Sequence, residues 1–377
     1  MKFIHIADLH LGKRVNEFSM IEEQRHVLAQ IREIAQNEDA DALLIAGDIY
    51  DKSIASGEAI ELFDWFLSEV HALNIKVFII SGNHDSAERT AFGQKLMQES
   101  NVFISPVYNG NISKYSFEDE YGVYNVFLLP FLKPANVKRF YPEEKIENYT
   151  DAIRIALKNC QIDPSTRNIL LSHQFVAGGS ICDSEIQIGG IDSVSADVYD
   201  KFDYVALGHL HGAQKIKRET MRYSGSILKY SFSEIKHKKS VCLVEMKEKG
   251  NIEIVLKELI PIHDMRKIEG TYNELTLKTN YENTHVDDYL RVVLRDEEDV
   301  IDALQRLRTI YPNIMKLEYQ NARTRSLRNI EDLQTQTRKS EIELFSQFYE
   351  EQTGVQINEE QRKISEKVFK QCKEAHE

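Results

Sequence analysis

Metal-binding side chains follow five short apolar segments of this sequence, each with the length and composition of a buried β-strand. Short runs rich in Ile, Leu, Val and Phe favour strands over helices. Ligands bind at the carboxyl ends of strands in open α/β sheets, so these side chains are expected to meet at one edge if the five strands run parallel in one sheet. The side chains in question are Asp8, His10, Asp48, Asn83, His173, His209 and His211.

The chemical types in this set predict a site for two metal ions. Carboxylates, an amide and imidazoles without a thiolate suit manganese first, and magnesium, iron and zinc stay open. Paired ions about 3.5–4 Å apart assist in-line displacements by holding the attacking and leaving oxygens. Such a site needs one ligand that contacts both ions, and Asp48, with two carboxylate oxygens at the centre of the set, is the expected bridge. A lone Gly-Asp or Asp-x-His is common in turns. Five clusters of ligand-type residues in succession, each after an apolar segment, predict the site.

The residues around these ligands resemble a known family. Residues 5–12 (HIADLHLG) and 81–86 (SGNHDS) resemble the calcineurin-like metallophosphoesterases. Three later segments are narrower and resemble the SbcD family, the nuclease subunits of bacterial SbcCD complexes. These are residues 172–175 (SHQF), 206–212 (ALGHLHG) and 223–234 (YSGSILKYSFSE). The resemblance covers nearly the whole chain, and every ligand position holds the expected residue type.

The resemblance implies a ligand assignment. One ion is expected on Asp8, His10, Asp48 and His211, and the other on Asp48, Asn83, His173 and His209. His84 matches the family's catalytic histidine, which binds no metal and is expected to protonate the leaving 3′ oxygen. General acids of this kind typically contribute about 10²–10⁴-fold in rate. Asp85 is either a residue that orients a ligand or a turn former, and the sequence leaves that open.

The resemblance also implies an activity and partners. The expected enzyme is a Mn²⁺-dependent DNA nuclease, a 3′→5′ exonuclease on double-stranded ends and an endonuclease on hairpins and single strands. It is expected to act with an SbcC-type ATPase in DNA repair, replication and recombination. The family forms homodimers through helices beside the catalytic core. Here the expected material is the helix near 56–73 and the helix that carries Phe92, Leu96 and Met97.

Two other functions remain open at this stage. The same site could serve a phosphodiesterase or protein phosphatase with another substrate. The phosphatase is disfavoured because residues 49–53 (IYDKS) lack the Arg-Gly that those enzymes place after Gly47-Asp48. The fold could also be a scaffold without activity, which missing ligands would indicate, and none is missing. Cleavage of a DNA hairpin, compared with that of a phosphoprotein, would separate the three.

Composition sets further limits. A net charge of −13 is unusual for a protein that binds nucleic acid, so DNA binding would rely on the metal ions and on local clusters. The local candidates are Lys215, Lys217, Arg218, Arg222 and the run 236–239 (KHKK), which is otherwise a solvated turn. The four cysteines are scattered, which fits a reducing compartment. No apolar run reaches the roughly 20 residues of a membrane span, and the amino-terminal strand is not a signal peptide, so a cytoplasmic location is expected.

The pattern of strands and helices predicts an α/β protein with four parts. Residues 1–265 form the nuclease domain, which the family resemblance implies is a β-sandwich flanked by helices. Residues 266–322 are expected to form a small α/β unit, which the resemblance implies is a capping domain, and the polar residues 323–340 a linker. Residues 341–377 predict two short amphipathic helices, with Phe345 and Phe348 as the best candidates for anchors. The resemblance implies that this helix–loop–helix binds the SbcC-type ATPase.

Overall fold

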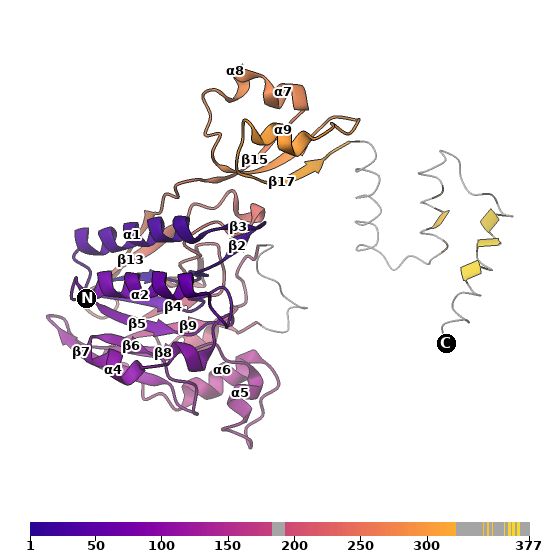
Figure 1. Cartoon of the computed structure of the whole chain (residues 1–377). Helices are drawn as coiled ribbons and strands as arrows, with labels where there is room; N and C mark the ends of the chain where they lie inside the picture. The colour runs from indigo at the N-terminus through magenta and orange to yellow at the C-terminus, as the bar shows by residue number, and fades with distance from the viewer. Residues whose placement is uncertain are drawn as a thin grey trace. The chain divides into compact units, whose positions relative to one another are not determined.

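The computed structural model describes residues 1–182 and 193–321 continuously. Beyond them it describes isolated positions, which are Ile342, Phe345, Ser346, Tyr349, Asn358, Gln361, Arg362, Ile364, Ser365, Val368 and Phe369. The chain divides into two compact units, Met1–Arg266 and Lys267–Glu377. Figure 1 shows the chain coloured from its amino terminus.

The first unit contains two six-stranded mixed sheets. The first sheet has the order β14-β13-β1-β4-β5-β6, with β1, β4, β5 and β6 parallel. Its strands are β1 (Lys2–Ile6), β4 (Ala42–Ala46), β5 (Lys76–Ile80), β6 (Val102–Ile104), β13 (Ser240–Met246) and β14 (Ile252–Glu258). The second sheet has the order β11-β12-β10-β9-β8-β7, and its strands β8, β9, β10 and β12 are parallel. These strands are β7 (Ser113–Asp119), β8 (Gly122–Leu129), β9 (Arg167–His173), β10 (Tyr204–Gly208), β11 (Gln214–Ile216) and β12 (Arg218–Tyr223).

The two sheets pack face to face around an apolar core. Phe3, Leu44 and Phe78 of the first sheet contact Ile169 and Tyr204 of the second, and all five are fully buried. Because each strand places alternate side chains on opposite faces, the outer faces need covers of their own. Helices supply them, and this makes the unit the expected β-sandwich flanked by helices (Figure 1).

Helices α1 (Ile21–Asn37) and α2 (Gly57–His71) contact each other, and α5 (Pro134–Lys138) and α6 (Tyr149–Lys158) pack in the core on the outer side of the second sheet. The α6 helix buries Ile153, Ile155 and Leu157. The smaller elements of the unit are β2 (Arg14–Val15), β3 (Phe18–Ser19), α3 (Ala87–Thr90), α4 (Gln94–Glu99) and the 3-10 helices η1 (Ala196–Tyr199) and η2 (Phe232–Glu234).

Two expectations about this unit need correction. The five strands that end in ligand-type residues do not share one sheet, since β1, β4 and β5 lie in the first and β9 and β10 in the second. Their ends still meet, because the sandwich brings both sets of carboxyl ends to one rim. The apolar spacing of the helix near 56–73 predicts that Ile60 lies on its buried stripe, yet its side chain is 52% exposed. The apolar runs 240–244 and 252–256 predict two antiparallel strands, and β13 and β14 confirm them.

The second unit has a small α/β core of its own. A three-stranded sheet of order β15-β16-β17 is formed by β15 (Met265–Gly270), β16 (Tyr289–Leu294) and β17 (Ile314–Tyr319). Helices α7 (Tyr272–Thr276), α8 (Lys278–Tyr281) and α9 (Ala303–Arg308) accompany it. The pattern of residues 300–307 predicts a helix, and the helix begins at Ala303 because Asp302 before it has left-handed backbone (φ 53°).

Most of the tail lies outside the described residues, including residues 323–340, Phe348 and Cys372. Asn358 caps the backbone N–H of Gln361, and the Gln361 side chain accepts from Asn358 N in return, as in a capping box. The rings of Phe345 and Phe369 are in edge contact at 5.9 Å. Across the described part of the chain, no helix is long and apolar enough to cross a membrane. The three described cysteines, Cys160, Cys182 and Cys242, are free thiols.

Candidate metal centre

The loops at the rim are held in an unusual backbone conformation. Four of the seven predicted ligands have positive φ, namely Asp8 (54°), His10 (44°), Asp48 (51°) and His209 (107°). Residues with side chains rarely adopt this region, and such positions cluster at functional sites because the surrounding structure must hold them there. The concentration of left-handed residues at one rim therefore points to a site rather than to ordinary turns.

Two glycines allow the loops to approach each other. A Cβ on Gly82 would lie 2.1 Å from Asp48 Oδ1, and one on Gly208 would lie 2.0 Å from the Ala46 carbonyl oxygen. No larger residue fits at either position. Gly208 ends β10 in the second sheet and Ala46 ends β4 in the first, so this contact closes the sandwich where the ligands converge.

Backbone and side-chain hydrogen bonds fix the loops to one another. Asp8 N donates to Gly47 O, and His10 N donates to Asp48 O, both at 3.0 Å. The Asp85 carboxylate accepts from the backbone N–H groups of Ile49, Tyr50 and Gly82, at 3.2, 3.0 and 2.8 Å. Asp85 therefore joins the loop after β4 to the loop after β5. This resolves the open alternative in favour of a residue that orients the ligand loops.

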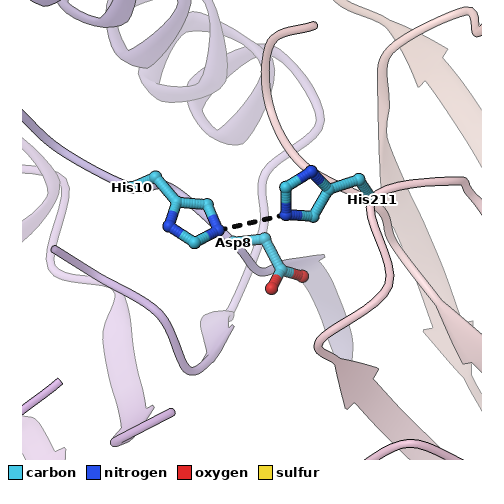
Figure 2. Close-up of side chains that lie close together, drawn as sticks. All are labelled: Asp8, His10 and His211. Carbon is cyan, nitrogen blue, oxygen red and sulfur yellow. Dashed lines mark hydrogen bonds between the residues drawn. The ribbon is translucent and has the colours of Figure 1, made fainter. Parts of the chain in front are cut away.

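Asp8, His10 and His211 form one group of donors at the rim, all three buried (Figure 2). The two imidazoles face each other, with His10 Nε2 and His211 Nε2 3.1 Å apart. The opposite nitrogen of His211, Nδ1, lies 3.2 Å from the Glu234 carboxylate. A proton on Nδ1 directed at Glu234 leaves the lone pair of Nε2 free for a metal ion.

Asp48, Asn83, His173 and His209 form the second group. Asn83 Oδ1 lies 3.0 Å from His173 Nε2 and 2.9 Å from His209 Nδ1. His173 Nδ1 lies 2.7 Å from the Ala46 carbonyl oxygen, so it is the protonated nitrogen and Nε2 faces the site. Asp48 Oδ2 is 3.3 Å from His173 Nε2 and 3.8 Å from His10 Nε2. Asp48 therefore lies between the two groups, as a bridging ligand must.

Burial and neighbouring charges shift the pKa values of the residues at this site in different directions. Burial raises the pKa of Asp8 to about 7 against the opposing effect of His173 and His211. Burial and the charge of His173 lower the pKa of His209 to about 3. Burial would also lower the pKa of His173, but the Asp48 carboxylate outweighs it and raises the value to about 9. A cation bound here would compete with protons on Asp8 and His173, so metal binding should release protons and strengthen with pH.

His84 lies beside this donor set in a different arrangement. Its backbone N–H donates to Asp48 Oδ1 at 2.8 Å, and its ring Nδ1 lies 2.9 Å from the Asp51 carbonyl oxygen. The ring is in edge contact with His10 at 4.8 Å. A proton on Nδ1 is thus held by Asp51, and Nε2 is the nitrogen left to exchange a proton with a substrate.

Several supporting residues were not assigned a role from the sequence. Glu234 is fully buried between His211 and Lys239, whose Nζ lies 2.6 Å from Glu234 Oε2. Lys239 was expected in a solvated turn, and it is only 6% exposed because it neutralises Glu234. Gln24 lies on the buried face of α1 and bonds to the His10 carbonyl. The signal for Gln24 in the sequence was its position one helical turn before Leu28, on the apolar face of the same helix.

The basic cluster proposed for DNA also needs correction. Lys215, Lys217, Arg218 and Arg222 each form an ion pair with an acid, either Glu219 or Asp200. Because these four bases share only two acids, the pairs balance about half of the local positive charge expected from this segment.

The sequence of this chain matches two family models and a named relative. A family model described as calcineurin-like phosphoesterase matches residues 1–213, which contain every predicted ligand. A second, described as type 5 capsule protein repressor C-terminal domain, matches residues 261–353. The chain is 33% identical over 322 residues to a Staphylococcus epidermidis protein that is named as a subunit of the nuclease SbcCD, the SbcD subunit. The match covers 84% of this chain and 85% of that one.

Solved structures give weaker likenesses. A dimetal phosphatase from Danio rerio is 13% identical, with a TM-score of 0.40, over 69% of this chain and 96% of its own. The phosphoesterase Yfce from E. coli is 13% identical, with a TM-score of 0.29, over 69% of this chain and 100% of its own. At these scores neither structure says anything about substrate.

Proposed function

We propose a substrate and a metal for this chain, which belongs to the calcineurin-like phosphoesterases and, within them, to the SbcD family, and is a phosphodiester hydrolase. The proposed substrate is DNA, and the proposed metal is manganese. The proposed activities are 3′→5′ degradation of double-stranded ends and endonucleolytic cutting of hairpins and single strands. The observation that supports them best is the convergence of carboxylate, amide and imidazole donors from five strand ends on one rim.

The donor set suits two divalent ions. Asp8, His10, Asp48 and His211 would hold one, and Asp48, Asn83, His173 and His209 the other. Oxygen and nitrogen donors without a thiolate favour manganese over softer ions. Bound ions would supply an activated water and would stabilise negative charge on the phosphate oxygens.

The chain's own residues would orient and finish the reaction. The left-handed loops hold Asp8, Asp48 and His209 in place before a substrate arrives, so no reorganisation is needed. His84, whose ring orientation is set by the Asp51 carbonyl, would donate a proton from Nε2 to the leaving 3′ oxygen. Its backbone N–H meanwhile holds Asp48.

The substrate proposal is tested by comparing three substrates at equal enzyme concentration. We expect Mn²⁺-dependent cleavage of a DNA hairpin and of a blunt duplex, and none of a phosphoserine peptide. EDTA should abolish cleavage, and Mn²⁺ should restore it better than Zn²⁺. Preferred dephosphorylation of the peptide would overturn the DNA assignment, and inertness toward all three with metal bound would indicate a scaffold.

We also propose that residues 341–377 bind an SbcC-type ATPase. The name of the Staphylococcus epidermidis relative is that of one component of a complex. In the tail, Phe345 contacts Phe369, while Ile364 and Val368 are 65% and 50% exposed. Aliphatic side chains left exposed beside a paired aromatic core fit an amphipathic docking helix. Deletion of 341–377 should abolish co-purification with the ATPase and leave cleavage of a small diester intact. Undiminished co-purification would place the contact elsewhere.

A homodimer is the third proposal. Exposed apolar side chains gather on α2, α4 and the segment before α4, where Ile60, Phe92 and Leu96 are 52%, 84% and 75% exposed. Ile60, Phe92 and Met97 also line a cavity of about 200 Å³. Exposed apolar clusters of this kind mark association surfaces. Light scattering of Leu96→Asp should give a monomer, whereas the control Ile301→Asp, at an 80% exposed site of the second unit, should stay dimeric. A monomeric wild type would reject the proposal. A cytoplasmic location stays a prediction.

A further inference from the structure

Two residues of α1 hold different parts of the first unit, although they are neighbours in the chain. Glu23 holds the connector, defined here as residues 259–264 between β14 and β15, through which the chain passes into the second unit. Its buried carboxylate accepts from Ile262 N at 2.8 Å, from His263 N at 3.1 Å and from His263 Nδ1 at 2.7 Å.

Gln24, the next residue, holds the loop that carries Asp8 and His10. Its Nε2 donates to the His10 carbonyl at 2.8 Å and to the Leu9 carbonyl at 3.3 Å. Its Oε1 accepts from Gly12 N at 3.0 Å. The side chain is fully buried, so an apolar replacement of Gln24 would remove the acceptor of Gly12 N and one donor from each of the two carbonyls.

A second pair of neighbours repeats this division. Lys229 holds the connector, because its Nζ lies 2.7 Å from Asp264 Oδ1. Tyr230 holds the metal loop, because its hydroxyl donates to the Leu9 carbonyl and accepts from Gln24 Nε2 at 3.0 Å. The Tyr230 ring also contacts His10 and His211 edge-on, at 5.6 and 6.0 Å.

We propose that Gln24 and Tyr230 are positioning residues for the Asp8–His10 loop, and that Glu23 and Lys229 couple their placement to the connector. The pairs Glu23–Gln24 and Lys229–Tyr230 thus form a linkage between the metal loop and the chain that leads into the second unit. The inference rests on the metal site proposed above.

The physical basis is the stiffness of short covalent and helical segments. Adjacent side chains on a helix point about 100° apart, so Glu23 and Gln24 face different partners while sharing one rigid turn. A displacement of the connector moves Glu23, and the same turn carries Gln24. His10 is sensitive to such a movement, because its left-handed backbone (φ 44°) persists only while its surroundings hold it. A partner or substrate that moves the connector would therefore alter the metal site.

The other end of α1 supplies a matched control. Lys257 of β14 pairs with Glu38, the residue that caps α1, at 2.6 Å. This is also an ion pair between a lysine and an acid, and Glu38 directly follows the last residue of α1. No contact of Glu38 or Lys257 reaches the metal loop among the described residues, so its loss should affect stability alone.

The test uses the full-length protein with Glu23→Gln and Lys229→Met as coupling variants and Glu38→Gln and Lys257→Met as controls. Glu23→Gln keeps the volume of the side chain and leaves one acceptor oxygen in place of two. Lys229→Met removes the positive charge. Two properties are measured: amide hydrogen exchange of residues 11–13 without metal, and Mn²⁺ affinity by calorimetry.

We expect each coupling variant to speed exchange at Gly12 and to weaken Mn²⁺ binding by about 10-fold, the lower end for residues that orient metal ligands. In a Gln24→Leu background, Glu23→Gln should add little, because the path through Gln24 is already broken. The controls should change neither property. Equal effects in all four variants, or coupling variants that only lower the melting temperature, would overturn the linkage.

Lys229→Met provides the test if Glu23→Gln does not fold. It should fold, because the Asp264 carboxylate that loses its partner is partly exposed to solvent. Hydrogen exchange and Mn²⁺ affinity need no DNA. If the wild type fails to cut DNA but these readouts behave as expected, the substrate proposal fails and the linkage stands. If the wild type binds no Mn²⁺, the metal site and the proposed function fail first.

Discussion

Strands β1 and β9 carry buried polar groups at both ends, and the two ends differ in kind. At the beginning, the amino group of Met1 and the guanidinium of Arg167 both bond to Asp119, and Met1 N lies 2.8 Å from its Oδ2. At the other end stand Asp8 and His173. One pair of strands thus connects a cluster of opposite charges to a cluster of metal-binding groups.

At the first end, donors face acceptors. Arg167 is 2% exposed, and besides Asp119 it donates to the carbonyl oxygens of Gly122 at 2.6 Å and Lys247 at 3.1 Å. Although partial burial acts in the opposite direction, the hydrogen bonds from Arg167 and the amino terminus lower the pKa of Asp119 to about 2. In this cluster the donors and acceptors largely satisfy one another, and their bonds hold the strands together.

At the second end, groups of the same kind face one another. His10 Nε2 meets His211 Nε2 at 3.1 Å, and Asp8 and Asp48 are buried in one cluster with His173. Burial raises the pKa of Asp8 and lowers that of His209, so the charged form of each group is disfavoured here. Buried polar residues therefore indicate a functional site where groups of the same kind face one another, and not where donors face acceptors.

Asp48→Asn should have the largest effect. It removes the carboxylate between the two donor groups while keeping its shape. We expect kcat/KM for DNA and for small diesters to fall at least about 10⁴-fold, or about 5 kcal/mol of transition-state stabilisation. Calorimetry should show fewer than two Mn²⁺ ions bound. The control Glu88→Gln, at an exposed acid on α3, should match the wild type. Two ions bound to Asp48→Asn with wild-type affinity would exclude a bridging role.

His84→Ala should separate proton transfer from metal binding. The backbone N–H that holds Asp48 remains, so both ions should still bind. We expect kcat on DNA to fall by about 10²–10⁴-fold, the range for a lost general acid. On bis(p-nitrophenyl) phosphate the defect should be much smaller, because p-nitrophenolate leaves without a proton. A lost ion, or equal defects on both substrates, would contradict the assignment.

The sequence predicts this second end well and the first end poorly, for a physical reason. The predicted ligands stand at strand ends with turn residues around them, so Asp8, Asp48 and His173 are visible from local pattern alone. The Asp119–Arg167 pair joins positions far apart in sequence, and nothing local marks either residue. The same holds for Glu234 and Gln24, whose partners come from distant loops.

The division of the strands into two sheets was also beyond the local pattern. Runs such as Ala42–Ala46 are buried on both faces in a single covered sheet and in a sandwich alike, so their composition cannot distinguish the two. The contact that closes the sandwich depends on Gly208 lying against Ala46, and a glycine before a histidine looks the same in any turn.

Asp119→Asn should have the smallest effect, and on stability rather than activity. The folded-state pKa of Asp119, about 2, lies below its ordinary value of 3.8, so its stabilisation is present above pH 3.8 and lost as pH falls toward 2. We expect the variant to be less stable by about 2 kcal/mol at pH 7, since Asp119 is partly exposed and its ion pairs are screened. Urea unfolding in EDTA at pH 7, 5, 4 and 3 should show the gap between wild type and variant shrinking below pH 4. Glu118→Gln, an exposed neighbour, controls for charge. A gap constant with pH would show that the charge of Asp119 is not the source of the stabilisation, and a loss of diester cleavage at pH 7 would show that the two ends of the strands are not independent.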